Sequence, residues 1–376
     1  MILEHSSAKI MVFLFGGKQN KSVFLENISV LNSNIQKLAF LNLTTISGNS
    51  ISTYCIINAY IIIITMNIIE SQRLALKWIF ESLKYFSPLD NGVINDPNTN
   101  KMFNELHLFL FLAYRNRRHF TIENFEIVEL ISQFTEPILL NPRYYEQIQI
   151  DPHCFRINGS SIIFYLSYKN NRKLESIIRK TYKIAQDITP EIIPFRKMDL
   201  EYNLYLASSY LNKDERDYAK MQNISKTSIL ASKFDLINFS ISEEYALTHS
   251  LFYLSDFGER SIFTDNNAEI EHNLLTLTLK NILANDMDLL GEYIINLCNL
   301  NINNEVCDIA SKTLFKSQRK DGSFPAPKRS KRLQHGINHR VNQKDYVNQN
   351  YHVTLVALIA TVFLIKSKNG DGQSIK

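Results

Sequence analysis

Leu106-His-Leu-Phe-Leu-Phe-Leu-Ala113 predicts a helix that carries apolar side chains on nearly every side. Val353-Thr-Leu-Val-Ala-Leu-Ile-Ala360 has the same character near the other end of the chain. A helix that is apolar all round has to be covered by other elements, because burial of its side chains is what stabilises it. These two stretches therefore predict an all-α protein in which some helices form an inner layer and others cover them.

Similar segments recur along the chain, and several open with an acid followed by an apolar or aromatic residue. Their first residues, 43 to 58 positions apart, are Glu105, Asn158, Glu201, Glu244, Glu292 and Asn350. This period is typical of helical hairpins. Partner helices richer in Lys, Arg, Glu and Asn are expected between them, at about 70–86, 122–135, 172–187, 225–234, 267–284 and 304–318. Six inner and six outer helices predict an (α/α)6 toroid over residues 66–366, with an open α-solenoid as the alternative.

Residues 1–65 differ in composition from the rest of the chain. No Asp, Glu, Lys or Arg lies between Lys37 and Glu70. We expect an extension outside the domain, for which three explanations stay open: a wrongly assigned start with Met66 as the true initiator, a disordered segment, or a marginal membrane anchor over 38–69. Residues 367–376 are expected to form a flexible tail.

The overall composition is that of a globular protein. Hydrophobic residues make up 45% and charged residues 21%, and the net charge of +4 gives no reason to expect a nucleic-acid partner. Cys55, Cys154, Cys298 and Cys307 form no CxxC pair and are too sparse for a disulfide scaffold. We therefore expect a cytoplasmic protein, with no membrane partner unless residues 38–69 form an anchor; the oligomeric state is not indicated.

Gln318-Arg-Lys-Asp-Gly-Ser-Phe324 resembles the Q-x-x-D-G-S-F/W motif of terpenoid cyclase and protein prenyltransferase toroids. The resemblance covers about residues 304–360 and implies a turn that ends an outer helix before the next inner one. Asp-Gly suits a tight turn on physical grounds as well. The motif occurs once, and the acidic D-x-D-D motif of cyclases is absent, so the resemblance implies a fold rather than terpene chemistry. The chain also resembles uncharacterised bacterial helical-hairpin proteins.

Candidate functional residues lie at the beginnings of the predicted inner helices, which converge on a central cavity in a toroid. Carboxylates and imidazoles there suit acid–base chemistry, and the catalytic candidates are Glu244, His249, Asp288, Glu292 and His352. The candidates for substrate contact are Glu201, Tyr202, Tyr245, Tyr293, Tyr351 and Asp321. Glu105 and His107 occupy an equivalent position. Helix capping, or a histidine bonded to a backbone carbonyl, is the structural alternative for each.

Two functions remain open on this evidence. One is an enzyme of specialised metabolism that acts on a small or peptidic substrate by acid–base chemistry. The other is a non-catalytic scaffold that binds a peptide or protein through the basic loop at about 325–348, which contains Lys328-Arg-Ser-Lys-Arg332. The spacing of Cys298, Cys307, His249 and His352 matches no zinc-ligand pattern, so we expect no metal ion and no cofactor.

Overall fold

The computed structural model describes residues 50–90, 93–94, 97–144, 146, 154–169, 172–187, 192–211, 218–233, 235–262, 267–327 and 342–368. The chain divides into two units, Met1–Met66 and Asn67–Lys376. Apart from the first part of α3 (Ser50–Ser82), which begins in the first unit, the features described below belong to the second. The expectations for the extension up to residue 49, for most of the basic loop and for residues 369–376 lie outside the described residues.

The described part of the chain is almost entirely helical, which confirms the all-α prediction. The exception is a pair of two-residue antiparallel strands, β1 (Leu89–Asp90) and β2 (Val93–Ile94).

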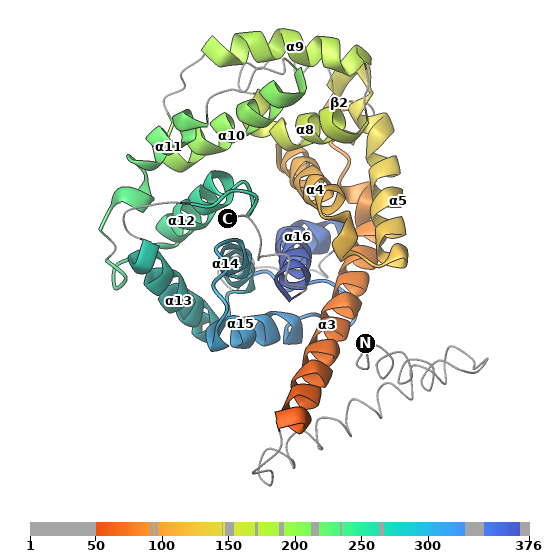
Figure 1. The fold of residues 1–376 in the computed structure, drawn as a ribbon. Coiled ribbons are helices and arrows are strands. Elements are labelled where there is room, and N and C mark those ends of the chain that lie inside the picture. Colours follow the sequence, from red (N-terminus) through yellow and green to blue (C-terminus); the bar gives the residue numbers. More distant parts are fainter. Residues whose placement is uncertain are drawn as a thin grey trace, which may run out of the picture. The chain divides into compact units, whose positions relative to one another are not determined.

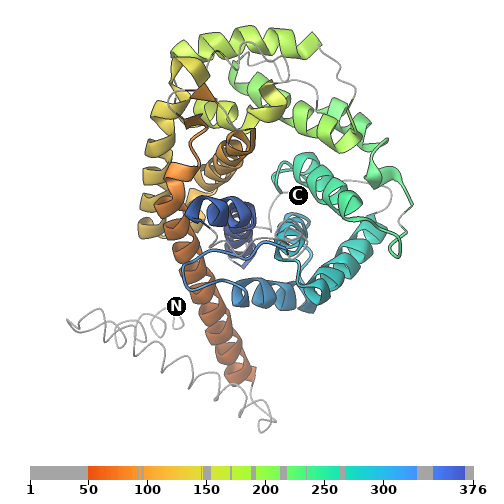
Figure 2. The ribbon, with the colours of Figure 1, turned by 180° about the vertical axis from the view of Figure 1, so that it is seen from behind.

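Six long helices coincide with the six apolar segments of the sequence. They are α4 (Pro97–Arg115), α8 (Gly159–Tyr168), α10 (Pro194–Leu211), α12 (Ile241–Leu254), α14 (Met287–Asn299) and α16 (Gln343–Lys368). Their side chains are mostly buried, as the pattern predicts; Leu106 and Leu358 are fully buried. Each of these helices contacts the next along the chain, and α16 contacts both α14 and α4. Figures 1 and 2 show this inner group from two opposite sides.

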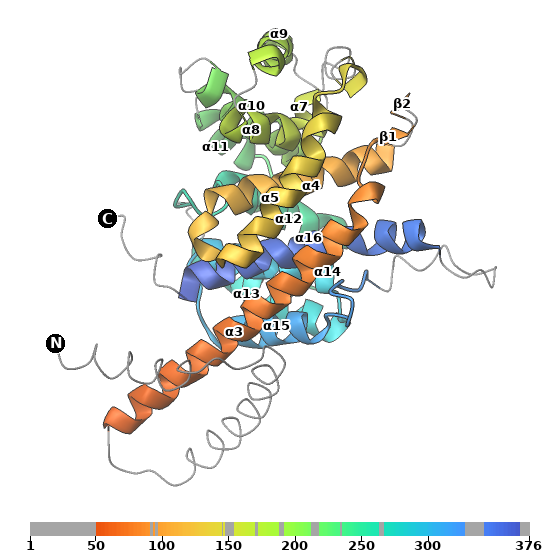
Figure 3. The same ribbon diagram turned by 90° about the vertical axis from the view of Figure 1, so that its right-hand side faces the viewer.

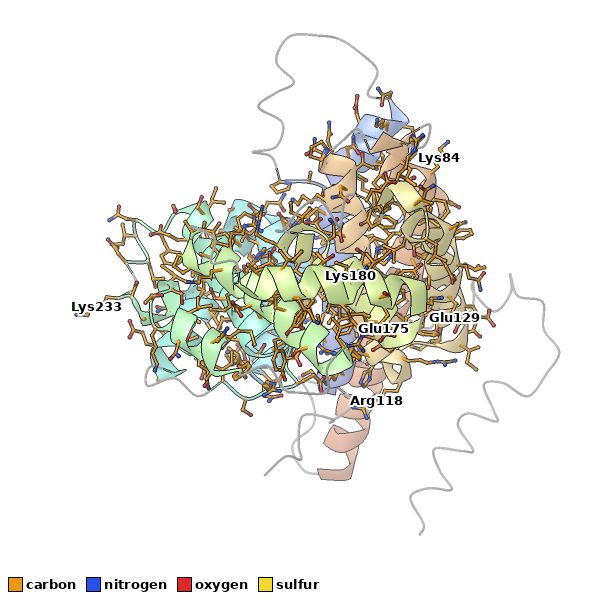
Figure 4. The ribbon with its side chains drawn as sticks, turned by 90° about the horizontal axis from the view of Figure 1, so that it is seen from above. Lys84, Arg118, Glu129, Glu175, Lys180 and Lys233 are labelled. Carbon is orange, nitrogen blue, oxygen red and sulfur yellow. The ribbon has the colours of Figure 1, made fainter. Side chains whose placement is uncertain are left out.

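A second set of helices lies outside the inner group. Its long members are α3 (Ser50–Ser82), α5 (Ile122–Leu139), α9 (Arg172–Asp187), α13 (Asn267–Ala284) and α15 (Glu305–Lys316). Figure 3 shows α5 alongside α4, and Figure 4 shows charged side chains such as Glu129 on α5 and Lys180 on α9 at the outside. The described residues also form short helical pieces: η1 (Leu83–Tyr85), η2 (Arg117–His119), α7 (Cys154–Ile157), α11 (Ala219–Ser225) and η3 (Ile229–Ala231).

Two outer helices differ from the prediction. The sequence predicted a helix over 70–86, but α3 begins at Ser50 and ends at Ser82. The sequence also predicted a helix over 225–234, but the short helix α11 ends at Ser225 and only the 3-10 turn η3 follows, at Ile229–Ala231. Hydroxyl side chains explain the interruption. Thr227 Oγ1 donates to the carbonyl of Ile224, and Ser228 Oγ donates to that of Ser225 and accepts from Leu230 N–H. Such local bonds compete with the helical ladder and end it.

The inner helices also begin before the acidic residues that were predicted to be their first residues. α4 begins at Pro97, so Glu105 lies about two turns into the helix rather than in its first turn. Glu201, Glu292 and Asn350 are likewise inside their helices, whereas Glu244 is in the first turn of α12. Among these acids, only Glu244 therefore lies where the helix dipole favours a negative charge.

α16 is the one helix among the described residues that is long and apolar enough to cross a membrane. Its most apolar window is 83% buried inside the protein, and a buried core helix has the same length and composition.

The turn at Gln318–Phe324 connects α15 to the segment before α16. Gly322 has a φ of 95°, and Phe324 is fully buried. Gln318 Nε2 donates to the carbonyl of Ser71 on α3, at 2.9 Å, and Phe324 N–H donates to Thr354 Oγ1 on α16, at 3.0 Å. The turn therefore joins an outer helix to an inner one.

Gly322→Ala is expected to lower the free energy of unfolding by about 3 kcal/mol or more. Its φ is unfavourable for L-residues, and a Cβ there would meet the backbone carbonyl oxygen of Leu74. Urea unfolding measures the change. The control is Lys320→Ala, at an exposed position of the same turn, which should stay within about 0.5 kcal/mol of wild type. Equal stability of the two variants would contradict this account of the turn.

His107 is expected to make folding stability depend on pH. Its ring is fully buried, its Nδ1–H donates to the carbonyl of Phe103 at 2.7 Å, and burial lowers its pKa to about 4. The unfolded chain therefore binds this proton at higher pH than the folded chain does. The contribution of His107 to the free energy of unfolding is therefore fully present above about pH 6.5. About 3 kcal/mol of it is lost as the pH drops to 4. The difference in unfolding free energy between wild type and His107→Leu, measured from pH 7 to 4, should show this slope; parallel curves would refute it.

Candidate functional site

His352 on α16 contacts carboxylates from two other helices. Its Nδ1 lies 2.9 Å from Glu105 Oε2 on α4. Its Nε2 lies 3.3 Å from Asp288 Oδ1 and 4.0 Å from Glu292 Oε1, both on α14. Asp288 and Glu292 share one face of α14 because they are four residues apart. One imidazole therefore bridges the first, fifth and sixth inner helices along the chain.

α12 supplies a second imidazole and two hydroxyl donors to the same carboxylates. His249 Nε2 lies 3.4 Å from Glu292 Oε1. Tyr245 Oη donates to Asp288 Oδ2, and Thr248 Oγ1 donates to Glu292 Oε2, each at 2.5 Å. The helical spacing of Tyr245, Thr248 and His249 places all three on the side of α12 that faces α14. We call Glu105, His249, Asp288, Glu292 and His352 the carboxylate–imidazole site.

The site combines buried carboxylates with imidazoles that solvent can reach. The side chains of Asp288 and Glu292 are 6% and 2% exposed. Those of His249, Glu105 and His352 are 20%, 22% and 29% exposed. The two imidazoles and Glu105 are therefore the part of the site that solvent reaches, and Asp288 and Glu292 are its buried part.

The electrostatics of the site keep His352 charged. Burial opposes the charge, but the carboxylates of Glu105 and Asp288 outweigh it and raise the pKa of His352 to about 10. Burial also works against ionised Glu105, yet His352 and Lys101 bring the pKa of Glu105 down to about 2. The pKa of Glu292 is lowered as well, because His249, His352 and Thr248 overcome the effect of burial. Without a ligand, an imidazolium among carboxylates is the stable state.

Two neighbours extend this site. Tyr351 donates a hydrogen bond to Glu105, and burial together with that carboxylate raises the tyrosine pKa. Asp199 on α10 lies near His249 and accepts a hydrogen bond from Tyr253; burial raises its pKa, while Arg196 and His249 act in the opposite direction.

The sequence analysis missed Asp199 and chose Glu201, two residues further along α10 and partly buried. Residues two positions apart on a helix point to different sides of it. Which of the two acids faces His249 therefore depends on the rotation of α10 about its axis, which the sequence does not define.

Glu244 and Tyr293 belong to a different buried group. Glu244 is 1% exposed and accepts from Lys280 Nζ at 2.7 Å, Asn281 Nδ2 at 2.6 Å and Tyr293 Oη at 3.0 Å. Lys280 and Asn281 are on the outer helix α13. These contacts neutralise and hold Glu244 between α12, α13 and α14, so the structure does not bring it to His352.

Other candidates are also held elsewhere. Tyr202 donates to Asp256 Oδ1 at 2.7 Å, and Arg115 pairs with the same oxygen at 2.7 Å. Asp321 accepts from Ser323 N–H at 3.0 Å within its own turn and from Tyr346 Oη, on the first turn of α16, at 2.8 Å. Both residues therefore stabilise local structure away from His352.

The two cysteines considered for zinc line a separate cavity. Cys298 and Cys307 are free thiols that meet at a pocket formed with Ile294 and Leu364, and the lining includes neither His249 nor His352. Burial raises the pKa of Cys298 to about 12 and also raises that of Cys307. The structure therefore places the two thiols at a pocket that His249 and His352 do not line, so a zinc ion shared by these four side chains does not fit the geometry.

Lys280→Met is expected to lower the free energy of unfolding by about 1–3 kcal/mol, because Glu244 loses its cation while remaining buried. Chemical unfolding at neutral pH measures the loss. Lys77→Met provides the matched control: Lys77 pairs with Glu81 at 3.7 Å, with both side chains 60% exposed, and its loss should cost less than about 0.5 kcal/mol. Equal losses in the two variants would show that Glu244 does not depend on Lys280.

Comparison with known proteins gives a family without an assigned activity. No curated protein and no solved structure matches the chain. Residues 72–362 match the family model described as "Domain of unknown function (DUF6895)", a range that includes every residue of the carboxylate–imidazole site. The chain belongs to this family, the DUF6895 domain proteins.

Proposed function

We propose that residues 66–366 form a closed (α/α)6 toroid. The order of helix contacts supports closure. Each inner helix packs against the next along the chain, and the sixth, α16, packs against the first, α4. An open α-solenoid of the same hairpins would leave its first and last inner helices apart. The contact between Glu105 on α4 and His352 on α16 is a specific link of this kind.

We further propose that the carboxylate–imidazole site is the active site of an enzyme that acts on a small or peptidic substrate by acid–base chemistry. The observation that carries the proposal is the meeting of two partly exposed imidazoles with three carboxylates drawn from four inner helices. Other buried charges described here, such as Glu244, are matched by a cation and amide or hydroxyl donors instead. A cytoplasmic role in specialised metabolism remains part of this proposal.

The residues of the site would have different roles in the reaction. His249 and Glu292, 3.4 Å apart, form the pair that exchanges a proton with the substrate. His352, held positive by Glu105 and Asp288, stabilises negative charge that develops during the reaction. Tyr245 and Thr248 fix the two α14 carboxylates through their hydroxyl groups.

His249→Gln is expected to reduce turnover by about 10²- to 10⁴-fold, because it removes the proton-transfer group while keeping a polar side chain. The full chain would be incubated with pooled polar metabolites and with short peptides, and conversion would be followed by mass spectrometry. His272→Gln, at an exposed position on α13, is the matched control and should keep wild-type turnover. Equal turnover in wild type and folded His249→Gln, or no conversion of any compound, would reject the acid–base role.

The scaffold function is the alternative outcome of the same experiment. A peptide that binds and is recovered unchanged would support it, and binding should then depend on the basic loop rather than on His249. Replacing residues 328–341 with a short Gly-Ser linker tests this directly. The replacement leaves in place Ala326, whose N–H donates to Asn350 Oδ1 at 3.0 Å, so the start of α16 keeps its contact.

A further inference from the structure

We propose that Asp288, Glu292 and His352 bind a divalent first-row transition-metal ion. The inference rests on the ligand site of the proposed function but does not require the proton transfer assigned to His249. Because an ion at His352 Nε2 would displace the proton there, the ion and not a His352 imidazolium would stabilise developing negative charge. It replaces the expectation that the protein takes no metal ion, which was based on sequence spacing alone.

The donor atoms are already gathered for such an ion. One ligand atom from each of the three residues lies within 4.8 Å of the other two. His352 Nε2 and Asp288 Oδ1 are 3.3 Å apart, and ligand atoms about 2.1 Å from a tetrahedral ion lie about 3.4 Å from each other. Glu292 Oε1 lies 4.0 Å from the same nitrogen and would have to approach it by about half an ångström.

Neighbouring hydroxyl groups bond the two carboxylate oxygens that do not face His352. Tyr245 Oη donates a hydrogen bond to Asp288 Oδ2, and Thr248 Oγ1 donates one to Glu292 Oε2. The remaining oxygens, Oδ1 and Oε1, are those that face His352 Nε2. Hydrogen bonds to the non-coordinating oxygen are the usual way in which a protein orients a carboxylate ligand.

Glu105 supplies the support that a histidine ligand requires. Its Oε2 lies 2.9 Å from His352 Nδ1, so that nitrogen carries a hydrogen and Nε2 is the atom turned toward α14. A carboxylate behind a histidine in this way is a recurring arrangement at metal centres, where it fixes the ring and increases its basicity. Glu105 is therefore a positioning residue and not a ligand.

The balance of charge favours a cation. Asp288 and Glu292 are almost fully buried, lie on one face of α14 and repel each other as neighbouring like charges. Without an ion, the nearest imidazoles are that of His352 for Asp288 and that of His249 for Glu292. A divalent ion at His352 Nε2 would take the place of the imidazole proton there and supply one further positive charge between the carboxylates.

The donor set also selects the kind of ion. One imidazole nitrogen with two carboxylates suits Zn²⁺, Mn²⁺ or Fe²⁺, whereas Ca²⁺ and Mg²⁺ prefer oxygen donors alone. Three protein ligands leave a coordination position open for water or substrate, which is typical of catalytic centres. His249 Nε2, 3.4 Å from Glu292 Oε1, lies beside one of the three ligand residues.

Equilibrium titration of the chelator-treated full chain with Zn²⁺ and with Mn²⁺ tests the proposal. We expect one ion per chain, and affinities for Mg²⁺ and Ca²⁺ at least 100-fold weaker than for Zn²⁺. Asp288→Asn and Glu292→Gln preserve side-chain shape and should each weaken Zn²⁺ binding by at least 100-fold. Glu105→Gln should weaken it by about 10- to 100-fold, and Glu105→Asp by less.

The controls separate this centre from surface chelation. Glu271→Gln and His272→Gln, at adjacent exposed positions on α13, should leave Zn²⁺ affinity unchanged. Absence of stoichiometric binding, or equal affinity in wild type and the two α14 variants, would overturn the proposal. X-ray absorption of the Zn²⁺-loaded wild type needs no variant to fold: nitrogen and oxygen donors with one imidazole are expected, and a sulfur donor would refute the assignment.

Failure of the metal proposal can be distinguished from failure of the enzyme proposal. Metal binding is measured without substrate, and conversion of substrate is measured with and without added ion. Turnover that depends on His249 but not on Zn²⁺ or Mn²⁺ would reject the metal and keep the enzyme. Stoichiometric binding without conversion of any compound would keep the metal and reject the acid–base function.

Discussion

The burial of helices that have no hydrophilic side is the constraint on which the rest of this structure depends. In α14 every residue from Met287 to Leu297 is buried, and α16 is almost continuously buried from Val353 to Ile365. A single covering layer cannot enclose such a helix, because it leaves the opposite face in water. Each inner helix therefore needs inner neighbours on both flanks as well as an outer helix behind it. Burial of each large apolar side chain contributes about 1.5–3 kcal/mol, so this arrangement is strongly favoured.

Buried polar residues on such helices need hydrogen-bond or charged partners within the protein. How completely these partners match each buried charge differs between sites. Glu244 has a lysine, an asparagine and a tyrosine, and Asp256 has Arg115 and Tyr202. These groups are matched within the fold. At His352 the balance is different, since Glu105, Asp288 and Glu292 share two imidazoles that solvent reaches. A protein that needed only stability could place apolar residues there at lower cost, because buried charges lose hydration energy. The imbalance is the physical reason to regard this place as a ligand site.

The helices were predictable from the sequence because their pattern is local. An apolar residue at nearly every position of 106–113 or 353–360 excludes an exposed helix whatever surrounds it. The outer helix predicted at 225–234 was wrong for a local reason also, since Thr227 and Ser228 bond their own backbone. Such hydroxyl bonds depend on side-chain rotamers that composition does not define.

The site was predictable only in part. His249, Asp288, Glu292 and His352 were selected as polar residues at or near the beginnings of predicted inner helices, and the structure brings these four together. Glu244 was selected by the same argument and lies elsewhere, because its helix turns it toward Lys280 on the outer layer. Glu105 was left out of the catalytic candidates, although it holds His352. Their contact joins residues 247 positions apart, and no periodicity along the chain contains that information.

That long-range contact also ties the proposed ring to the proposed chemistry. Glu105 is on the first inner helix and His352 on the last, so the two meet only if those helices lie side by side. In an open solenoid Glu105 would be separated from His352, and the imidazole would lose the carboxylate that orients it. Closure of the ring and completion of the site are then one structural event. Loss of Glu105 should accordingly disturb the site while leaving the apolar packing of α4 against α16 in place, since that packing does not depend on the carboxylate.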